Sequence, residues 1–230
     1  MKEFSTTNGP FPTQPFYEDD EIERICEDEL ARANLLPSEP GPVRIDRFIE
    51  KRFGITPTTR DLPPGVLGYT TFSGSGVKEI VIATTIDDDE DATTRRRART
   101  TFAHEASHGL LHAHLFASAF LQQRLEHSST DAPQVLCRDE PLGQRRAGYD
   151  GRWWEVQANK GMAALLLPRQ LVHKAIAPFV KKEGMLGLTS LPEPERETAA
   201  RHLSNVFDVN PVVARHRLTA LIPTTNQAVL

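Results

Sequence analysis

The chain has 230 residues, of which 39% are hydrophobic and 25% are charged, and it carries a formal net charge of −4. This length allows a sizeable buried core, and the mildly acidic balance argues against a surface devoted to nucleic acid or anionic lipid. No apolar run approaches the roughly 20 residues that span a bilayer. Because the start of the chain has neither an apolar signal core nor a small-residue cleavage site, we expect a cytoplasmic protein without a membrane partner.

The first feature expected along the chain is a flexible arm over residues 1–17, since this proline- and threonine-rich stretch shows no periodicity. Amphipathic helices are predicted next over 18–34 and 43–54, and the second ends at a glycine. Residues 65–72 and 77–85 are strand candidates, rich in β-branched side chains and separated by the turn-forming sequence SGSG. They predict a small antiparallel sheet.

A long helix is predicted from the charged block at 87–99 to about residue 114. Acidic residues at its start, followed by arginines, favour a capped and solvated helix end over a charged binding patch. After an ambiguous stretch, WWEVQANKGMAALLLP predicts a buried helix that Pro168 stops or kinks. The C-terminal sequence RETAARHLSNVFDVNPVVARHRLTAL predicts helix, turn and helix, with Asn210 as N-cap and Pro211 as the first helical residue. These elements together predict a single α+β unit.

The stretch TTFAHEASHGLLHAHL, residues 100–115, places four histidines and a glutamate on the long helix. Within it, His104 to His108 fit the pattern HExxH. Residues four apart on a helix lie about 6 Å apart along its axis and roughly 40° apart around it, so both imidazoles can reach one metal ion. Glu105 would lie beside the ion, where it can take a proton from an activated water. The pattern also occurs by chance, so alone it does not distinguish a metal site from an ordinary helix.

A catalytic zinc site requires a third protein ligand. His114 stands ten residues after His104, as in the pattern HExxHxxGxxH, but Leu111 occupies the glycine position and an unbroken helix points His114 roughly 120° away. Glu155 is the preferred candidate, because a carboxylate on a largely buried helix is costly unless it is paired or bound to metal. Asn159, on the same face, can accept the outer N–H of a ligating histidine. Taken alone, Glu155 also fits an exposed helix start.

The sequences FAHEASHGLLH and EVQANKGMAALLLP together resemble the ImmA/IrrE family of zinc metallopeptidases. Its signature joins an HExxH helix with a trailing Leu-His to a downstream glutamate, an Ala-Asn pair and a Leu-Leu-Met-Pro-like helix end. The resemblance implies a mostly helical, zincin-like core of the gluzincin type, with one catalytic Zn²⁺. It carries the family's metal ligands onto His104, His108 and Glu155, and its general base onto Glu105.

The resemblance extends over residues 20 to 220 and has two departures, neither at a ligand. Lys160-Gly161-Met162 stands where the family tends to have a residue followed by Phe-Ala, and Leu167 replaces methionine. The implied organisation is a zinc metallopeptidase domain at 18–190, followed at 191–230 by a helix-turn-helix-like segment packed on it or docked to it.

Four other features have both a functional and an ordinary interpretation. Cys137 can act as a fourth zinc ligand that holds the enzyme latent, although buried structural cysteines are commoner. Tyr149 can stabilise an oxyanion or belong to an aromatic cluster with the neighbouring tryptophans. His112 is interpreted as a partner of a ligand or as part of a cleft wall. Residues 196–218 have the spacing of a DNA-binding motif, but the acidic chain and the flanking glutamates argue against DNA binding.

We therefore predict a zinc-dependent, site-specific endopeptidase that uses Glu105 and an activated water. The resemblance implies a helix-turn-helix transcriptional repressor of the phage type as its protein substrate, cleaved to relieve repression in a stress response. Residues 77–85 are expected to hold a substrate segment as an added strand. The alternative is a non-catalytic regulatory protein with structural zinc, which docks to a repressor or an antitoxin-type partner.

Overall fold

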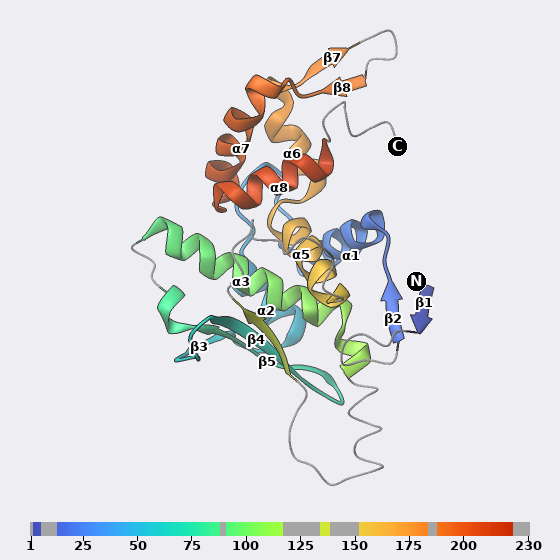
Figure 1. The fold of residues 1–230 in the computed structure, drawn as a ribbon, viewed down its shortest axis with the longest axis vertical. Helices are drawn as coiled ribbons and strands as arrows, with labels where there is room; N and C mark the ends of the chain where they lie inside the picture. Colours follow the sequence, from blue (N-terminus) through green and yellow to red (C-terminus); the bar gives the residue numbers. More distant parts are fainter. Residues whose placement is uncertain are drawn as a thin grey trace.

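The computed structural model describes residues 2–5, 13–87, 91–116, 134–138, 152–183 and 188–222. Its architecture is α+β, with a small sheet on one side of a group of helices (Figure 1). The helices are α1 (Asp19–Arg32), α2 (Ile45–Phe53), α3 (Ala92–Leu111), α5 (Trp153–Leu166), α6 (Arg169–Ile176), α7 (Glu193–Phe207) and α8 (Pro211–Leu221), with short 3₁₀ turns at Thr84–Ile86 and Ala177–Phe179. None of the described helices combines the length and the apolar composition needed to cross a membrane.

The main sheet contains four strands in the order β3-β5-β4-β6. They are β3 (Thr58–Arg60), β4 (Val66–Ser73), β5 (Gly76–Ala83) and β6 (Gln134–Arg138), and of β6 only the backbone is described. The predicted hairpin is confirmed, because β4 and β5 pair antiparallel across a short turn. The sheet is not purely antiparallel, since β3 runs parallel to β5.

This strand order narrows the expectation that residues 77–85 accept substrate as an added strand. The outer edge of Val81–Ala83 is already paired with β3, and the last residues of the segment form a 3₁₀ turn. The strand next to α3 in the region of the candidate site is β4, which pairs with β5 on one edge and with β6 on the other. Substrate therefore cannot pair with Val81–Ala83 as an added strand, whereas for residues 77–80 the expectation stays a prediction.

Part of the segment expected as a flexible arm forms a hairpin instead. Strands β1 (Lys2–Ser5) and β2 (Thr13–Phe16) pair antiparallel, and Pro15 is buried. The backbone carbonyl of Pro15 accepts a hydrogen bond from Gln157 of α5 at 2.7 Å. The proline- and threonine-rich sequence gives no periodic signal for this pairing, because its anchor lies 142 residues further along the chain.

Helix α3 lies between the sheet and α5 and contacts both (Figure 1). It begins as the sequence predicts: the Asp91 carboxylate caps it by accepting from the Thr94 N–H at 2.7 Å. Its second half is nearly continuously buried, so its polar residues need partners inside the protein. This helix is the element that carries the HExxH residues.

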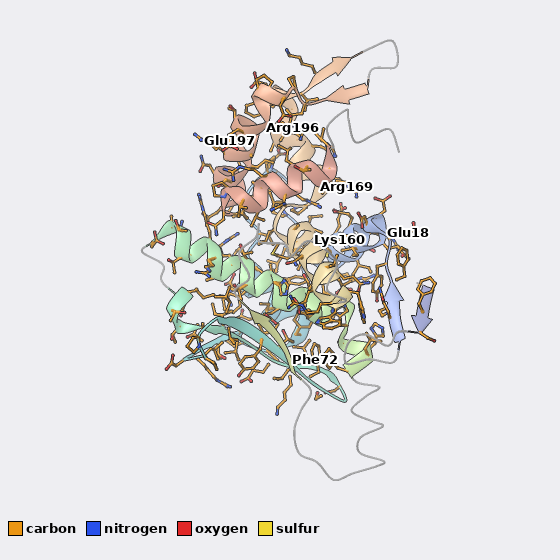
Figure 2. All side chains as sticks on the ribbon, in the orientation of Figure 1. Glu18, Phe72, Lys160, Arg169, Arg196 and Glu197 are labelled. Carbon is orange, nitrogen blue, oxygen red and sulfur yellow. The ribbon has the colours of Figure 1, made fainter. Side chains whose placement is uncertain are left out.

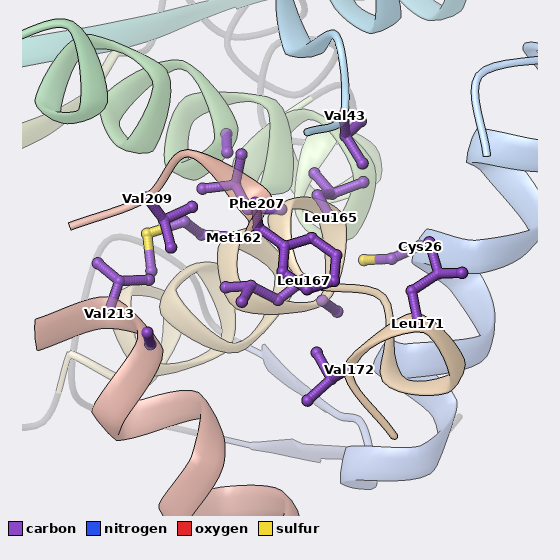
Figure 3. Packing of buried hydrophobic residues seen from close by; sticks show 14 of the residues in the cluster. Cys26, Val43, Met162, Leu165, Leu167, Leu171, Val172, Phe207, Val209 and Val213 are labelled. Atoms are coloured by element: carbon purple, nitrogen blue, oxygen red, sulfur yellow. The ribbon is translucent and has the colours of Figure 1, made fainter. Parts of the chain in front are cut away.

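One hydrophobic cluster joins the N-terminal helices, α3, α5 and the C-terminal helices. Figure 3 shows Met162 and Leu165 of α5 in the same cluster as Phe207, at the end of α7, and Val213 of α8. Cys26 of α1 is buried there as a free thiol, and its burial raises the pKa of that thiol. The C-terminal helices therefore share a core with the rest of the chain.

Two ion pairs connect α1 to α5 and to the start of α6. Lys160 of α5 lies 2.5 Å from an Asp19 carboxylate oxygen, and Arg169 of α6 lies 2.7 Å from Asp20; both cations are labelled in Figure 2. Because these side chains are largely solvated, each pair contributes little to stability on its own.

The turn between α7 and α8 is held against α3 by a cluster of arginines. Asp208 ends α7 in the left-handed conformation, with φ of 51°. Its carboxylate accepts hydrogen bonds from Arg96 at 2.9 Å and from Arg95 at 3.4 Å, and the Arg99 Nε lies 3.8 Å away. The arginine-rich block of α3 therefore serves the fold. The predicted start of α8, with Asn210 as the N-cap residue and Pro211 first in the helix, is confirmed.

Candidate metal centre

The two histidines of the HExxH pattern turn toward α5, as the helical spacing predicts. His104 is 5% exposed and His108 is fully buried. Their Nε2 atoms lie 3.1 Å apart, and the ring planes cross at 76°. Both rings thus present the same type of nitrogen atom to one point in the space between α3 and α5.

Glu155 reaches the same point from the first turn of α5. Its Oε2 lies 3.1 Å from the His104 Nε2, and its Oε1 lies 3.7 Å from the His108 Nε2. Among the described residues, these three side chains form the group of potential metal ligands, with ligand atoms that all lie within 4.8 Å of one another. The exposed helix start is thus not the setting of Glu155, whose side chain is 17% exposed.

The spacing of these atoms and their chemistry fit a zinc ion. Four ligands at roughly 2.0–2.1 Å in a tetrahedron lie about 3.3 Å from one another. The separation of the two Nε2 atoms is 3.1 Å, and each lies 3.1 or 3.7 Å from a different oxygen of the Glu155 carboxylate, so the three groups are close enough to share one ion. Two imidazole nitrogens and one carboxylate leave a fourth position for water or substrate, which is the composition of catalytic rather than structural zinc sites.

The protonation states also suit metal binding, which requires neutral imidazoles and an ionised carboxylate. Burial raises the pKa of Glu155, but its contacts with His104 and His108 outweigh the effect of burial and hold that pKa well below the usual range. Burial lowers the pKa of His108 despite the neighbouring carboxylate.

Each of the two histidines that could bind a metal has a partner on its outer nitrogen. The His104 Nδ1 lies 3.1 Å from the Asn159 Oδ1, so the contact predicted for Asn159 is confirmed. The His108 Nδ1 lies 3.0 Å from the Nδ1 of His112, which is completely buried. His112 in turn lies 2.9 Å from the Oε1 of Gln157. Gln157 was not singled out from the sequence, although it is a polar residue in a helix that is otherwise largely buried.

Glu105 faces the sheet instead of α5. The Thr70 hydroxyl of β4 donates to its Oε2 at 2.7 Å and is 3.1 Å from its backbone carbonyl oxygen. The close approach depends on Gly68, because a Cβ at that position would lie 2.8 Å from the Val81 carbonyl oxygen and from a methyl group of Thr101. Thr70 was also missed from the sequence, where nothing marks it among the β-branched residues of its strand.

The remaining candidates do not join the three ligands. His114 is exposed and lies outside the cluster, although α3 ends at Leu111 and not near residue 114 as predicted, so an unbroken helix is not the reason for its position. Cys137 lies in β6, where its backbone pairs with Gly68, but its side chain is outside the described part of the structure. Tyr149 lies outside the described residues altogether. The proposals of a thiolate latch and a tyrosine oxyanion donor therefore stay predictions.

Comparison with known proteins does not assign the chain to a family: no protein-family model matches it, and a search of the curated proteins finds no match. The resemblance to ImmA/IrrE peptidases therefore rests on the two motifs that contain His104 and Glu155. What the site does has to be inferred from the geometry of the three side chains and of their partners.

Proposed function

We propose that the protein is a zinc-dependent endopeptidase with His104, His108 and Glu155 as metal ligands and Glu105 as general base. The observation that carries this proposal is the convergence of two Nε2 atoms and a carboxylate at separations of 3.1 to 3.7 Å. A zinc ion bound there would polarise a peptide carbonyl and make a nearby water molecule more acidic.

Glu105 handles the proton in the proposed reaction. It follows the first ligand directly on α3, so its carboxylate can take a proton from the attacking water and pass it to the departing amine nitrogen. The hydroxyl of Thr70 holds one carboxylate oxygen at 2.7 Å and so restricts the carboxylate to one orientation. Because both groups are buried, this hydrogen bond is stronger than it would be in water.

We propose the gluzincin-like class of the fold together with this function. Helices α3 and α5 with the sheet would form a gluzincin-like core, and α7 and α8 a helix-turn-helix-like segment packed on it. The resemblance supplies the substrate class, a phage-type repressor cleaved in the cytoplasm to relieve repression. A role in a stress response rests on the same resemblance.

The arginines of α8 favour a protein over DNA as the partner of this segment. Arg217 is 4% exposed; its guanidinium donates to the Leu167 carbonyl at 2.9 and 3.0 Å and also to the Glu23 carboxylate. Arg215 donates to Glu197 of α7 at 2.7 Å. Both cations that would contact phosphates are therefore engaged within the fold.

The test combines zinc content with cleavage of a proteome-derived peptide library read by mass spectrometry. We expect about one zinc per wild-type chain and in Glu105→Gln, and a large loss of zinc in Glu155→Ala. Cleavage should fall by roughly 10² to 10⁴-fold in Glu105→Gln, the usual contribution of general acid–base catalysis. Zinc-loaded wild type that cleaves no peptide would favour the docking protein instead. Wild type that binds no zinc would refute the metal site itself.

A further inference from the structure

A continuous chain of hydrogen bonds runs from a ligating histidine to the N-terminal hairpin. The His108 Nδ1 lies 3.0 Å from the His112 Nδ1, and the His112 Nε2 lies 2.9 Å from the Gln157 Oε1. The Gln157 amide nitrogen then donates to the Pro15 carbonyl at 2.7 Å. All four residues are buried, and Gln157 is 7% exposed, so bulk water has little access as a substitute partner for the groups between the two ends.

The carbonyl of Pro15, at one end of this series of hydrogen bonds, fixes the donor and the acceptor of each bond in the series. A backbone carbonyl only accepts, so the NH₂ group of Gln157 must face Pro15 and its carbonyl oxygen must face His112. The Nε2 of His112 must then carry the hydrogen, which leaves its Nδ1 as an acceptor. His108 consequently donates from its own Nδ1, and the lone pair of its Nε2 faces Glu155, where the ion would bind.

The opposite orientation would be incompatible with metal binding. If the amide of Gln157 were reversed, its NH₂ group would meet the Nε2 of His112 and force the hydrogen of that ring onto Nδ1. His108 would then accept at Nδ1 and carry its hydrogen on Nε2, the atom that faces the other ligands. The carbonyl of Pro15 therefore selects between a tautomer of His108 that can bind a metal and one that cannot.

We infer that His112 and Gln157 are positioning residues that hold His108 in its metal-binding tautomer, with the carbonyl of Pro15 in β2 as the anchor. Trp153 supports this arrangement, because its ring lies edge-on to that of His112 at 5.6 Å between centroids and restricts the rotation of the imidazole. His104 does not depend on the chain, since Asn159 provides its partner. The inference rests on the proposed metal site but not on peptidase activity.

The direct test is the tautomer of His112, read from nitrogen chemical shifts and two-bond couplings in protein labelled with ¹⁵N-histidine. We expect hydrogen on Nε2 and none on Nδ1, both in zinc-loaded and in metal-free protein, because the bond pattern is imposed from Pro15 and not by the metal. Hydrogen on the Nδ1 of His112 in either form would overturn the inference. Wild type that binds no zinc would refute the metal site and with it this inference, whereas zinc-loaded protein that cleaves no peptide would refute only the proposed function.

Zinc affinity, measured by competition with a chromogenic chelator, gives the second readout. His112→Asn and His112→Leu are similar in size, but only asparagine keeps an acceptor where Nδ1 stood. We expect affinity about 10 to 100-fold weaker in His112→Leu, the usual effect of losing an outer partner, with much of it recovered in His112→Asn. Gln157→Leu should weaken zinc binding in the same range. Lys160→Leu, on the same helix but not part of the hydrogen-bond series, should leave zinc binding unchanged.

Equal zinc affinity in His112→Leu and His112→Asn would overturn the positioning role, since a purely structural loss would affect the pair alike. If Gln157→Leu binds zinc as tightly as wild type, Gln157 is not a positioning residue. Circular dichroism of each variant establishes whether it is folded, and the tautomer measurement on wild type keeps the inference testable should one of them not fold.

Discussion

The crossing of α3 and α5 sets the positions of the ligands, and Gly161 makes that crossing close. A Cβ added at Gly161 would lie 2.8 Å from the Oγ and 2.9 Å from the Cβ of Ser107, where non-bonded contacts are normally about 3.5–4.0 Å. Gly161→Ala should therefore push the helices apart locally. Since Glu155 belongs to the same helix, zinc binding should weaken together with stability.

The expected size of the effect is the difference between two opposing contributions. Overpacking a core costs about 1–3 kcal/mol, whereas alanine is better than glycine inside a helix by roughly 1 kcal/mol. We therefore expect Gly161→Ala to lose about 1 kcal/mol, which lowers the melting temperature of a chain of this length by about 2–4 °C. Thermal unfolding of the metal-free protein measures the first effect, and chelator competition measures the second.

Two variants control the interpretation. At Gly41 an added Cβ would meet only the Glu39 carbonyl oxygen, at 3.8 Å, so Gly41→Ala should not lower stability. Adding Ser107→Gly to Gly161→Ala removes the atoms in the clash, and the double variant should be more stable than the two single effects predict together. The reasoning is refuted if Gly161→Ala raises the melting temperature and binds zinc normally.

Three further predictions follow from individual contacts. Burial raises the pKa of Asp208 and the arginine hydrogen bonds lower it more, so its contribution to stability is present above the unfolded pKa of about 3.9 and is lost as the pH falls through the folded value. Asp208→Asn should thus be less stable than wild type at pH 7, with a difference that disappears in acid; a constant difference would contradict this. Thr70→Val should reduce kcat about tenfold through loss of the bond to Glu105, with zinc content unchanged. Arg217→Met should cost up to about 3–5 kcal/mol in urea unfolding because it leaves the carboxylate of Glu23 with only Arg169, at 3.9 Å, and adding Glu23→Gln should recover part of that; no recovery would show that packing dominates.

Local signals predicted the elements on which the site is built. The cap at Asp91, the left-handed Gly54 at the end of α2 and the Asn210-Pro211 start of α8 all depend on neighbouring residues, and the structure confirms them. Helical periodicity also identified Asn159 as a partner, because it shares a face with Glu155. Features that depend only on residues close together in the sequence could therefore be predicted without the structure.

The features that were missed depend on contacts between distant segments. Gln157 lies two residues from Glu155, and residues at this spacing do not share a helix face, so the reasoning that found Asn159 passed over it. Thr70 acquires its role only because β4 packs on α3, 35 residues later in the chain. β3 has three residues and no periodic signal, and its parallel pairing with β5 could not be read from either segment alone.

The long reach of the bond between Gln157 and Pro15 has a consequence for the order in which the site can form. On a ribosome, the N-terminal hairpin and the helix that carries both histidines are synthesised well before α5. Until α5 follows, the nascent chain has neither the third ligand nor the amide that sets the tautomer of the second histidine. In the proposed peptidase, metal binding would thereby be deferred until about two thirds of the chain has been made, so that an incomplete chain would not present a finished hydrolytic centre.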